Sequence, residues 1–377
     1  MIQSNTIDLD DLSPYDTADP AGMGRHIAAF PERILKGWEA AGELALPGGY
    51  RGVTRVLVQG MGGSAIAGDI AGEALDGLTM DASGAAPRVD VHRDYGAHPA
   101  AGPGTLVIAL SHSGRTEEAL SGVEASLERG ARLIAMTGGG PLARAAARHD
   151  LPVIGMPRTG GPPRAFLPYA LGALLRLLCD LCVPSAAAFA GAALQSAVEE
   201  LRQAQADFAP SCRRSNPAKE LARALAGRVP VIVSSRGLVS AARRWKTQIN
   251  ENAKTPAWTE ELPEMHHNAV VGFEQPRLRE NLSVVLLGPP APDDDGPARE
   301  RYVISRDVFS RLNTPAHWPT LRGGTRLSRL LEAVLLGDYV SYYLALVNGV
   351  DPMPTETLDR VKDRIRGAAA VVDGHAE

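Results

Sequence analysis

The chain has 377 residues, of which 45% are hydrophobic and 22% are charged, a balance that excludes general disorder. Its formal net charge of -4 argues against a polybasic surface for nucleic acid or acidic lipid. At about 150 residues per domain, this length predicts two domains. We expect a cytoplasmic protein for two reasons. The chain has only three cysteines, an odd and low number that suits a reducing compartment. Its N-terminal sequence has neither the basic nor the apolar part of a secretory signal.

Residues 1–50 are predicted to form an N-terminal helical arm with one helix near 23–42. From about Arg51, short apolar runs alternate with helical patterns, which is typical of a parallel sheet covered on both faces. Five strands within 51–185 point to a flavodoxin-like, doubly wound domain. The predicted strands are 55–59, 88–92, 105–110, 132–136 and 151–154, and the predicted helices are 64–77, 115–129 and 140–149.

The most apolar stretch of the chain is 167–194. Arg176 and Asp180 interrupt it, so a buried pair of helices is favoured over a membrane span. Cys179 and Cys182 lie inside it at C-x-x-C spacing, but no second cysteine pair or histidine cluster lies nearby to complete a zinc site. We therefore interpret both cysteines as small buried residues on one helical face.

Residues 186–225 are Ala-rich and periodic, and they are predicted to be a helical connector. A second α/β pattern occupies 226–377, with a strand at 229–235, a helix at 238–252 and a strand at 282–287. Each half begins with a strand, a loop of small residues and a helix, which suggests an internal duplication. The Pro- and Asp-rich segment 289–297 is predicted to be a solvated loop.

Two strand ends of the first domain run into small-residue loops, 60–64 and 111–116, that open helices. Ligands of doubly wound sheets bind beyond the carboxyl ends of the strands, so both loops face one crevice. A helix N-terminus there offers unpaired N–H groups that suit a phosphate. Hydroxyl groups can add hydrogen bonds and glycines let the backbone approach the ligand closely. The hydroxyl residues are Ser111, Ser113 and Thr116, and the glycines are Gly62, Gly63 and Gly114.

Taken singly, each loop is equally well explained as a helix cap or a turn, because Ser and Gly are the usual residues there. Their occurrence at two strand ends of one sheet favours an anion site. The first loop is not a dinucleotide fingerprint, since it lacks the third glycine of G-x-G-x-x-G.

A second informative region joins the end of the helix 238–252 to the segment 264–268. It contains Glu251 at the helix end and the adjacent histidines His266 and His267. A carboxylate and an imidazole can serve as base and acid in a proton-transfer enzyme. By residue type alone, all three are also explained as solvated surface residues.

These features together resemble the bifunctional phosphoglucose/phosphomannose isomerases, a branch of the sugar isomerase (SIS) domain superfamily. The resemblance runs from about Arg51 to Arg366 and depends on an ordered set of motifs rather than on any single one. The motifs are Gly60-Met61-Gly62-Gly63-Ser64, Ser111-x-Ser113-Gly114-x-Thr116-Glu117-Glu118, Pro163-Arg164-Ala165, Asn250-Glu251-Asn252-x-Lys254-x-Pro256, Pro263-Glu264-x-x-His267-Asn268 and Asp351-Pro352 with Lys362.

The resemblance implies two SIS domains, each a flavodoxin-like αβα sandwich, and a homodimer with shared active sites. It implies isomerisation of glucose 6-phosphate and mannose 6-phosphate to fructose 6-phosphate through an enediolate, without metal or cofactor. Glu251 would be the base between C1 and C2, and Arg164 would stabilise the enediolate. His267 of the partner and Lys362 would assist ring opening, and Thr355 would influence which epimer is accepted. The residues that would hold the substrate phosphate are Gly63, Ser64, Ser111, Ser113 and Thr116.

Two positions depart from the family pattern. Arg115 stands where relatives often have Asn, and places an additional cation beside the phosphate loop. His266 stands where Asn is common, which leaves open which of the two histidines acts. The alternatives are a non-catalytic sugar-phosphate-binding SIS protein and an SIS isomerase of another sugar phosphate. The first is disfavoured because the N-terminal arm has no basic helix-turn-helix signature of a regulator.

Overall fold

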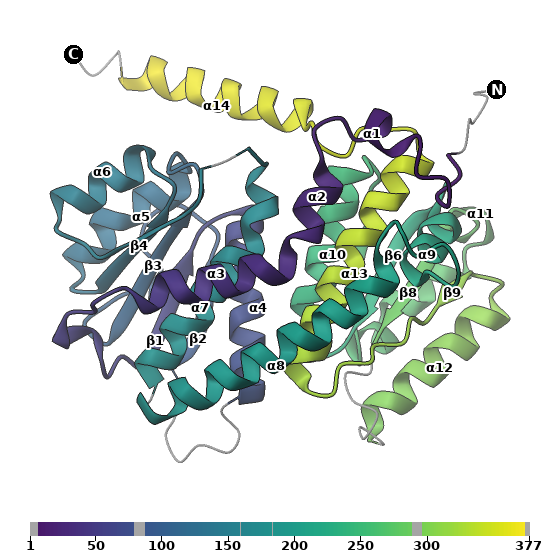
Figure 1. Cartoon of the computed structure of the whole chain (residues 1–377), viewed down its shortest axis with the longest axis horizontal. Coiled ribbons are helices and arrows are strands. Elements are labelled where there is room, and N and C mark those ends of the chain that lie inside the picture. The colour runs from purple at the N-terminus through teal and green to yellow at the C-terminus, as the bar shows by residue number, and fades with distance from the viewer. Residues whose placement is uncertain (1–6, 79–86, 159, 183, 289–295, 374–377) are drawn as a thin grey trace.

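The structure, a computed structural model, describes residues 7–78, 87–158, 160–182, 184–288 and 296–373. Two parallel sheets lie in separate halves of the molecule, and long helices pack between them (Figure 1). The two sheets confirm the predicted α/β fold with two parallel-sheet domains. The predicted loop at 289–297 falls largely outside the described residues.

The first sheet has five parallel strands in the order β2-β1-β3-β4-β5, the flavodoxin-like order. Its central strand β3, Thr105–Ser111, is buried along its whole length, which explains its continuous apolar sequence. The other elements of this domain are β1 (Arg55–Gln59), α4 (Gly62–Leu78), β2 (Arg88–His92), α5 (Glu117–Glu128), β4 (Arg132–Thr137), α6 (Gly140–Arg148), β5 (Val153–Gly155) and the 3-10 turn η2 (Pro163–Phe166).

The second sheet has four parallel strands in the order β7-β6-β8-β9, which repeats the order of the first four strands of the first sheet. This repetition supports the predicted duplication. Helix α10 (Val239–Asn252) follows β6 as α4 follows β1. The remaining elements are β6 (Val229–Ser234), β7 (Trp258–Glu261), η3 (Glu264–His267), η4 (Ala269–Glu274), α11 (Pro276–Arg279), β8 (Leu282–Leu287), α12 (Pro297–Arg311), β9 (Ala316–His317), α13 (Arg326–Val347) and α14 (Glu356–Asp373).

The N-terminal arm is not the single helix predicted over 23–42. It breaks at Ala29 into α2 (Met23–Ala28) and α3 (Phe30–Gly42). Pro31 lies at the start of α3 and cannot continue the hydrogen bonds of a preceding helical turn. The short elements α1 (Tyr15–Ala18) and η1 (Gly48–Tyr50) flank this pair.

The arm packs closely on α7 (Leu167–Cys182), the first member of the predicted buried helix pair. A Cβ atom on Gly37 of α3 would lie 1.9 Å from the carbonyl oxygen of Tyr169. A Cβ atom on Gly172 of α7 would lie 1.9 Å from the carbonyl oxygen of Ile34. Glycine at both positions therefore permits this helix crossing. Cys179 is buried in α7, as expected, whereas the side chain of Cys182 lies outside the described part of the chain.

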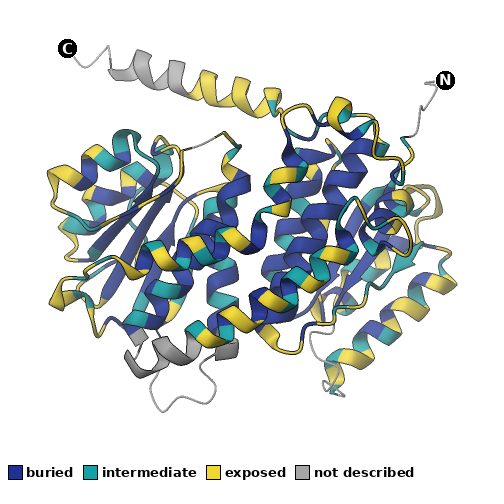
Figure 2. Cartoon of the chain, in the orientation of Figure 1, coloured by how far each residue is buried: buried dark blue, intermediate teal, exposed yellow. Residues whose placement is uncertain are grey.

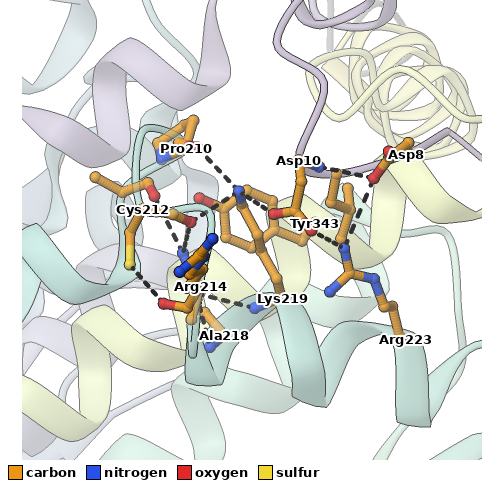
Figure 3. A network of polar contacts seen from close by, with 12 residues as sticks. Asp8, Asp10, Pro210, Cys212, Arg214, Ala218, Lys219, Arg223 and Tyr343 are labelled. Carbon is orange, nitrogen blue, oxygen red and sulfur yellow. Dashed lines mark hydrogen bonds and ion pairs between the residues drawn. The ribbon is translucent and has the colours of Figure 1, made fainter.

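The helical connector consists of α8 (Pro184–Phe208) and α9 (Pro217–Leu225). A fully buried lysine on α9, Lys219, ties the N-terminal segment to the second domain (Figure 3). Its ammonium group donates to Asp10 at 3.0 Å and to the carbonyl oxygens of Pro210 and Cys212 at 2.9 and 3.0 Å. The hydrogen bond from Lys219 lowers the pKa of Asp10, which is consistent with a charged pair.

Helix α13 forms the core between the two sheets, and Figure 2 shows it buried on every side. Among the described residues it is the one helix long and apolar enough to cross a membrane, but 94% of that apolar stretch is buried inside the protein. A helix that is apolar all round occupies a protein core as readily as a membrane. Its burial here assigns it to the core.

Candidate active site

The loop 111–116 forms a closed turn between β3 and α5. Ser111 is buried at the strand end, and its hydroxyl lies 2.8 Å from the hydroxyl of Thr116. The amide of Thr116 donates to the Ser111 oxygen at 3.4 Å, and the amide of Arg115 donates to the exposed Ser113 at 3.2 Å. These hydrogen bonds within the loop hold its shape, and Ser113 is accessible at its tip.

Gly114 is required in this turn for two reasons. Its φ of +65° is in the left-handed region that favours glycine. A Cβ atom there would lie 1.8 Å from the carbonyl oxygen of Gly139, in the neighbouring loop at the end of β4. The loop 111–116 therefore keeps its shape only with glycine at position 114.

The second loop, residues 60–64, begins helix α4 beside it. Gly62 has a φ of +52°, and a Cβ atom on Gly63 would contact the Cα atom of Arg164 at 3.4 Å. The absence of a side chain at Gly63 allows the turn η2, which carries Arg164, to approach the N-terminus of α4. Ser64 follows in the first turn of that helix.

Arg164 is the centre of the site and is only 4% exposed. Its Nε donates to the Asn252 side-chain oxygen at 2.8 Å, and its Nη1 donates to the Glu251 carboxylate at 3.3 Å. Its Nη2 donates to the carbonyl oxygens of Pro352 and Met353 at 2.7 and 2.8 Å. Burial lowers the pKa of Arg164, and Glu251 opposes this shift. One guanidinium therefore joins η2, the end of α10 and the C-terminal segment.

Glu251 lies in the last turn of α10 with 29% of its side chain exposed, so one face of the carboxylate remains accessible. Lys254, whose part in the site the sequence did not reveal, fixes this helix end. Its ammonium group donates to the carbonyl oxygens of Glu251 at 2.9 Å and Asp351 at 2.6 Å. Burial and the nearby Arg164 lower the pKa of Lys254.

The two candidate histidines occupy different environments on η3. His266 lies 2.9 Å from the Ser305 hydroxyl and 3.2 Å from Arg301, both on α12. Burial and Arg301 lower its pKa. His267 is exposed, and its side chain makes no hydrogen bond or ion pair within the described ranges. These contacts give His266 a packing role and leave His267 as the available imidazole.

The remaining candidates lie toward the C-terminus. Thr355 directly precedes α14 and is two residues beyond Met353, whose carbonyl oxygen accepts from Arg164. Lys362 is exposed on α14, where its nearest charged partner is Asp359 at 3.9 Å. Within one chain, no contact among the described residues links Lys362 or His267 to Glu251.

Two residues that sequence reasoning did not single out support the turn η2. The ring of His112, in the loop 111–116, stacks on Phe166 with centroids 4.2 Å apart, and its Nε2 lies 2.9 Å from the carbonyl oxygen of Pro157. Arg33 of the N-terminal arm donates to the carbonyl oxygen of Ala165 at 2.6 Å and lies over the same Phe166 ring. Arg115, which departs from the family pattern, has an exposed side chain in the loop 111–116.

Comparisons with known proteins show the family to which the chain belongs. Residues 51–167 match the SIS domain family, and residues 214–365 match the bacterial phospho-glucose isomerase C-terminal SIS domain. A bifunctional phosphoglucose/phosphomannose isomerase of Caldicellulosiruptor bescii is 32% identical over 345 residues, covering 91% of this chain and 98% of the relative. The chain belongs to this family.

Further similarities support the assignment. The bifunctional phosphoglucose/phosphomannose isomerase of Aquifex aeolicus is 31% identical, covering 87% of this chain and 94% of that protein. The crystal structure of a glucose-6-phosphate isomerase-like protein from Thermus thermophilus is similar in fold, with a TM-score of 0.58, 20% identity and coverage of 95% and 99%. The predicted family, the SIS fold and the isomerase class are confirmed.

Proposed function

We propose that this isomerase interconverts glucose 6-phosphate and mannose 6-phosphate with fructose 6-phosphate through an enediolate, without a metal ion. The observation that carries the proposal is the position of Glu251. Its partly exposed carboxylate is held 3.3 Å from the buried Arg164, whose backbone adjoins the loop 60–64 at Gly63. This arrangement supports the proposal, because a phosphate on that loop would lie near both a candidate base and a permanent cation.

The chemistry follows from these groups. The phosphate of the open-chain sugar is held by the N–H groups and hydroxyls of the two loops. Glu251 takes the proton from C2 of the aldose, which places negative charge on O1 of the enediolate. The hydroxyl proton then moves from O2 to O1, and Glu251 returns its proton to C1, which gives the ketose with its carbonyl group at C2. Arg164 keeps its charge at neutral pH and stabilises that developing charge.

We further propose that the enzyme is a cytoplasmic homodimer with shared active sites. Three apolar side chains of α14, Leu358, Val361 and Ile365, are between 41% and 49% exposed and recur at the spacing of one helix face. Lys362 lies beside them on the same exposed helix, which runs along the outside of the molecule (Figures 1 and 2). In the proposed dimer this face would pack on a second copy, and Lys362 and the partner subunit's His267 would assist the reaction as the family resemblance implies. Thr355 and Arg115 remain our candidates for epimer choice and phosphate affinity.

The decisive experiment is a coupled assay of the purified chain with both hexose phosphates in the presence of EDTA. Activity should persist with EDTA, and its loss on chelation would reject the metal-free mechanism. Glu251→Gln should bind fructose 6-phosphate but lose about 10²–10⁴-fold in kcat, the usual contribution of general acid–base catalysis. Glu261→Gln, an exposed carboxylate on β7, is the matched control. Binding of both sugars without turnover by the wild type would favour a binding protein.

The shared site is tested by mixing two inactive variants. Glu251→Gln and His267→Ala should each be inactive alone. Heterodimers formed by refolding them together should recover activity, because they contain one site with both residues intact. Continued inactivity of refolded, dimeric mixtures would place both residues in the same chain's site. Light scattering should show a dimer for the wild type.

A further inference from the structure

Helix α10, which carries Glu251 at one end, begins without a cap of its own. Its N-cap residue is Leu238, whose side chain cannot accept a hydrogen bond from the first turn. The N–H groups of this turn are bound by Glu73, which lies on α4 of the other domain. One carboxylate oxygen accepts from the amides of Gly237 at 2.8 Å and Val239 at 3.1 Å, and the other accepts from the amide of Ser240 at 2.9 Å and from its hydroxyl.

A second carboxylate on the same face of α4 strengthens this contact. Asp69, one helical turn before Glu73, forms an ion pair with Arg243 of α10 at 2.8 Å, and only 14% of its side chain is exposed. A cavity of about 350 Å³ adjoins the contact and is lined by Asp69, Glu73, Ser240 and Arg243 among others. The two acidic residues thus hold the start of α10 from the side of the first domain.

The duplication makes this arrangement informative. In the first domain, the helix after the first strand is α4, and its N-terminus is the loop 60–64, one of the two loops proposed to hold phosphate. In the second domain the corresponding helix is α10, and its N-terminus is bound by Glu73. The protein's own carboxylate therefore occupies in the second domain the place that a phosphate would take in the first under the proposed function.

The two helices run in opposite directions across the domain boundary. At one end Arg164 joins Gly63 of α4 to Asn252 of α10, and at the other end Glu73 of α4 holds Ser240 of α10. Glu251 lies eleven positions after Ser240, which corresponds to about 16 Å along the axis of α10. A tilt of this helix by about 4° therefore moves one of its ends by about 1 Å relative to the other. A displacement of about 1 Å at a reacting group can reduce the rate by about 10²-fold.

The geometry points to Glu73 as a positioning residue of the isomerase. By fixing the first turn of α10 on α4, it sets the separation between the loop 60–64 and Glu251. This inference rests on the proposed role of Glu251. It predicts an effect on kcat rather than on KM, because both loops proposed to hold phosphate, 60–64 and 111–116, belong to the first domain and keep their places when the start of α10 is released.

The test compares Glu73→Ala, Glu73→Gln and Glu73→Asp in the full-length protein, with Glu128→Gln on the exposed end of α5 as the control. We expect kcat to fall by about 10- to 100-fold in the Ala and Gln variants, with KM within about threefold of the wild type. The Asp variant should lose less, because it keeps the charge. Added acetate should raise kcat of the Ala variant by entering the adjacent cavity, and should not affect the control.

Circular dichroism and thermal unfolding show whether each variant is folded, and the isosteric Gln variant serves if the Ala variant is not. The inference is overturned if kcat is unchanged in the folded Ala variant or the folded Gln variant. It is also overturned if kcat/KM falls only through an increase in KM. Wild-type turnover tests the proposed function separately, since the positioning role is measured only as the ratio of variant to wild-type kcat.

Discussion

Replacing Arg164 should destabilise the whole chain as well as the active site. Arg164→Ala leaves three acceptors without their donor, namely the side-chain oxygen of Asn252 and the carbonyl oxygens of Pro352 and Met353. An unsatisfied buried acceptor costs about 1–3 kcal/mol. Glu251 is partly solvated, so its lost partner adds little, and we take the lower limit for each acceptor. The free energy of unfolding should fall by about 3 kcal/mol.

This loss corresponds to a decrease in Tm of about 6–12 °C, at about 2–4 °C per kcal/mol for a domain of this size. Arg164→Lys should lose about half as much, because an ammonium group keeps the charge but cannot reach all partners of a planar guanidinium. Urea unfolding followed by circular dichroism measures the difference, with the exposed Arg144→Ala of α6 as the control. An Arg164→Ala protein within about 0.5 kcal/mol of the wild type would refute this account of the site.

Two further predictions concern the loop 111–116. Gly114→Ala should raise KM for the hexose phosphate by about 10-fold or more, because the new Cβ atom would push the loop away from Gly139. Gly52→Ala is the control and should leave KM unchanged, because Gly52 has a similar φ but no atom lies within 4 Å of the added Cβ. An unchanged KM for Gly114→Ala would show that the loop does not bind phosphate. Burial lowers the pKa of His112 below its usual value of 6.5. Below about pH 6.5 the unfolded chain therefore binds a proton at His112 more readily than the folded chain, and the free energy of unfolding decreases as the pH decreases. Urea titrations from about pH 7 to 5 should show a shallower fall for His112→Asn, and parallel curves would contradict the shift.

The first sheet could be predicted closely from the sequence because its central strands are buried and form nearly continuous apolar runs. The strand at 55–59 has the predicted bounds and is buried beyond Arg55. The strand at 88–92 also has the predicted bounds, although it is a partly exposed edge strand, because its valines alternate with polar residues. Strand β7 was missed because its residues, Trp258–Glu261, are mostly polar and lie at the edge of the second sheet. Helix α13 was missed because it is buried on all sides and has no polar face to give a helical period.

The candidate site shows a similar division. The loops and Glu251 were found because their residue types are tied to local chain features, a strand end or a helix end. The contacts of Arg164 join residues 88 and 188 positions apart, and no local pattern reports such distances. Glu73 gave no signal because its partner is a helix in another domain, although the apolar Leu238 at the N-cap of α10 was an indication that the cap comes from elsewhere.

The partners of Arg164 also impose an order of events during synthesis. The first domain can form its sheet as it leaves the ribosome, but Arg164 meets Pro352 only after 188 further residues have been added. At about 5–20 residues per second this takes roughly 10–40 s. During that interval the guanidinium stays in water, because burying it without acceptors is costly. The contacts of Arg164 are therefore completed only after Pro352 has been synthesised, and we expect a nascent chain shorter than this to lack the proposed active site.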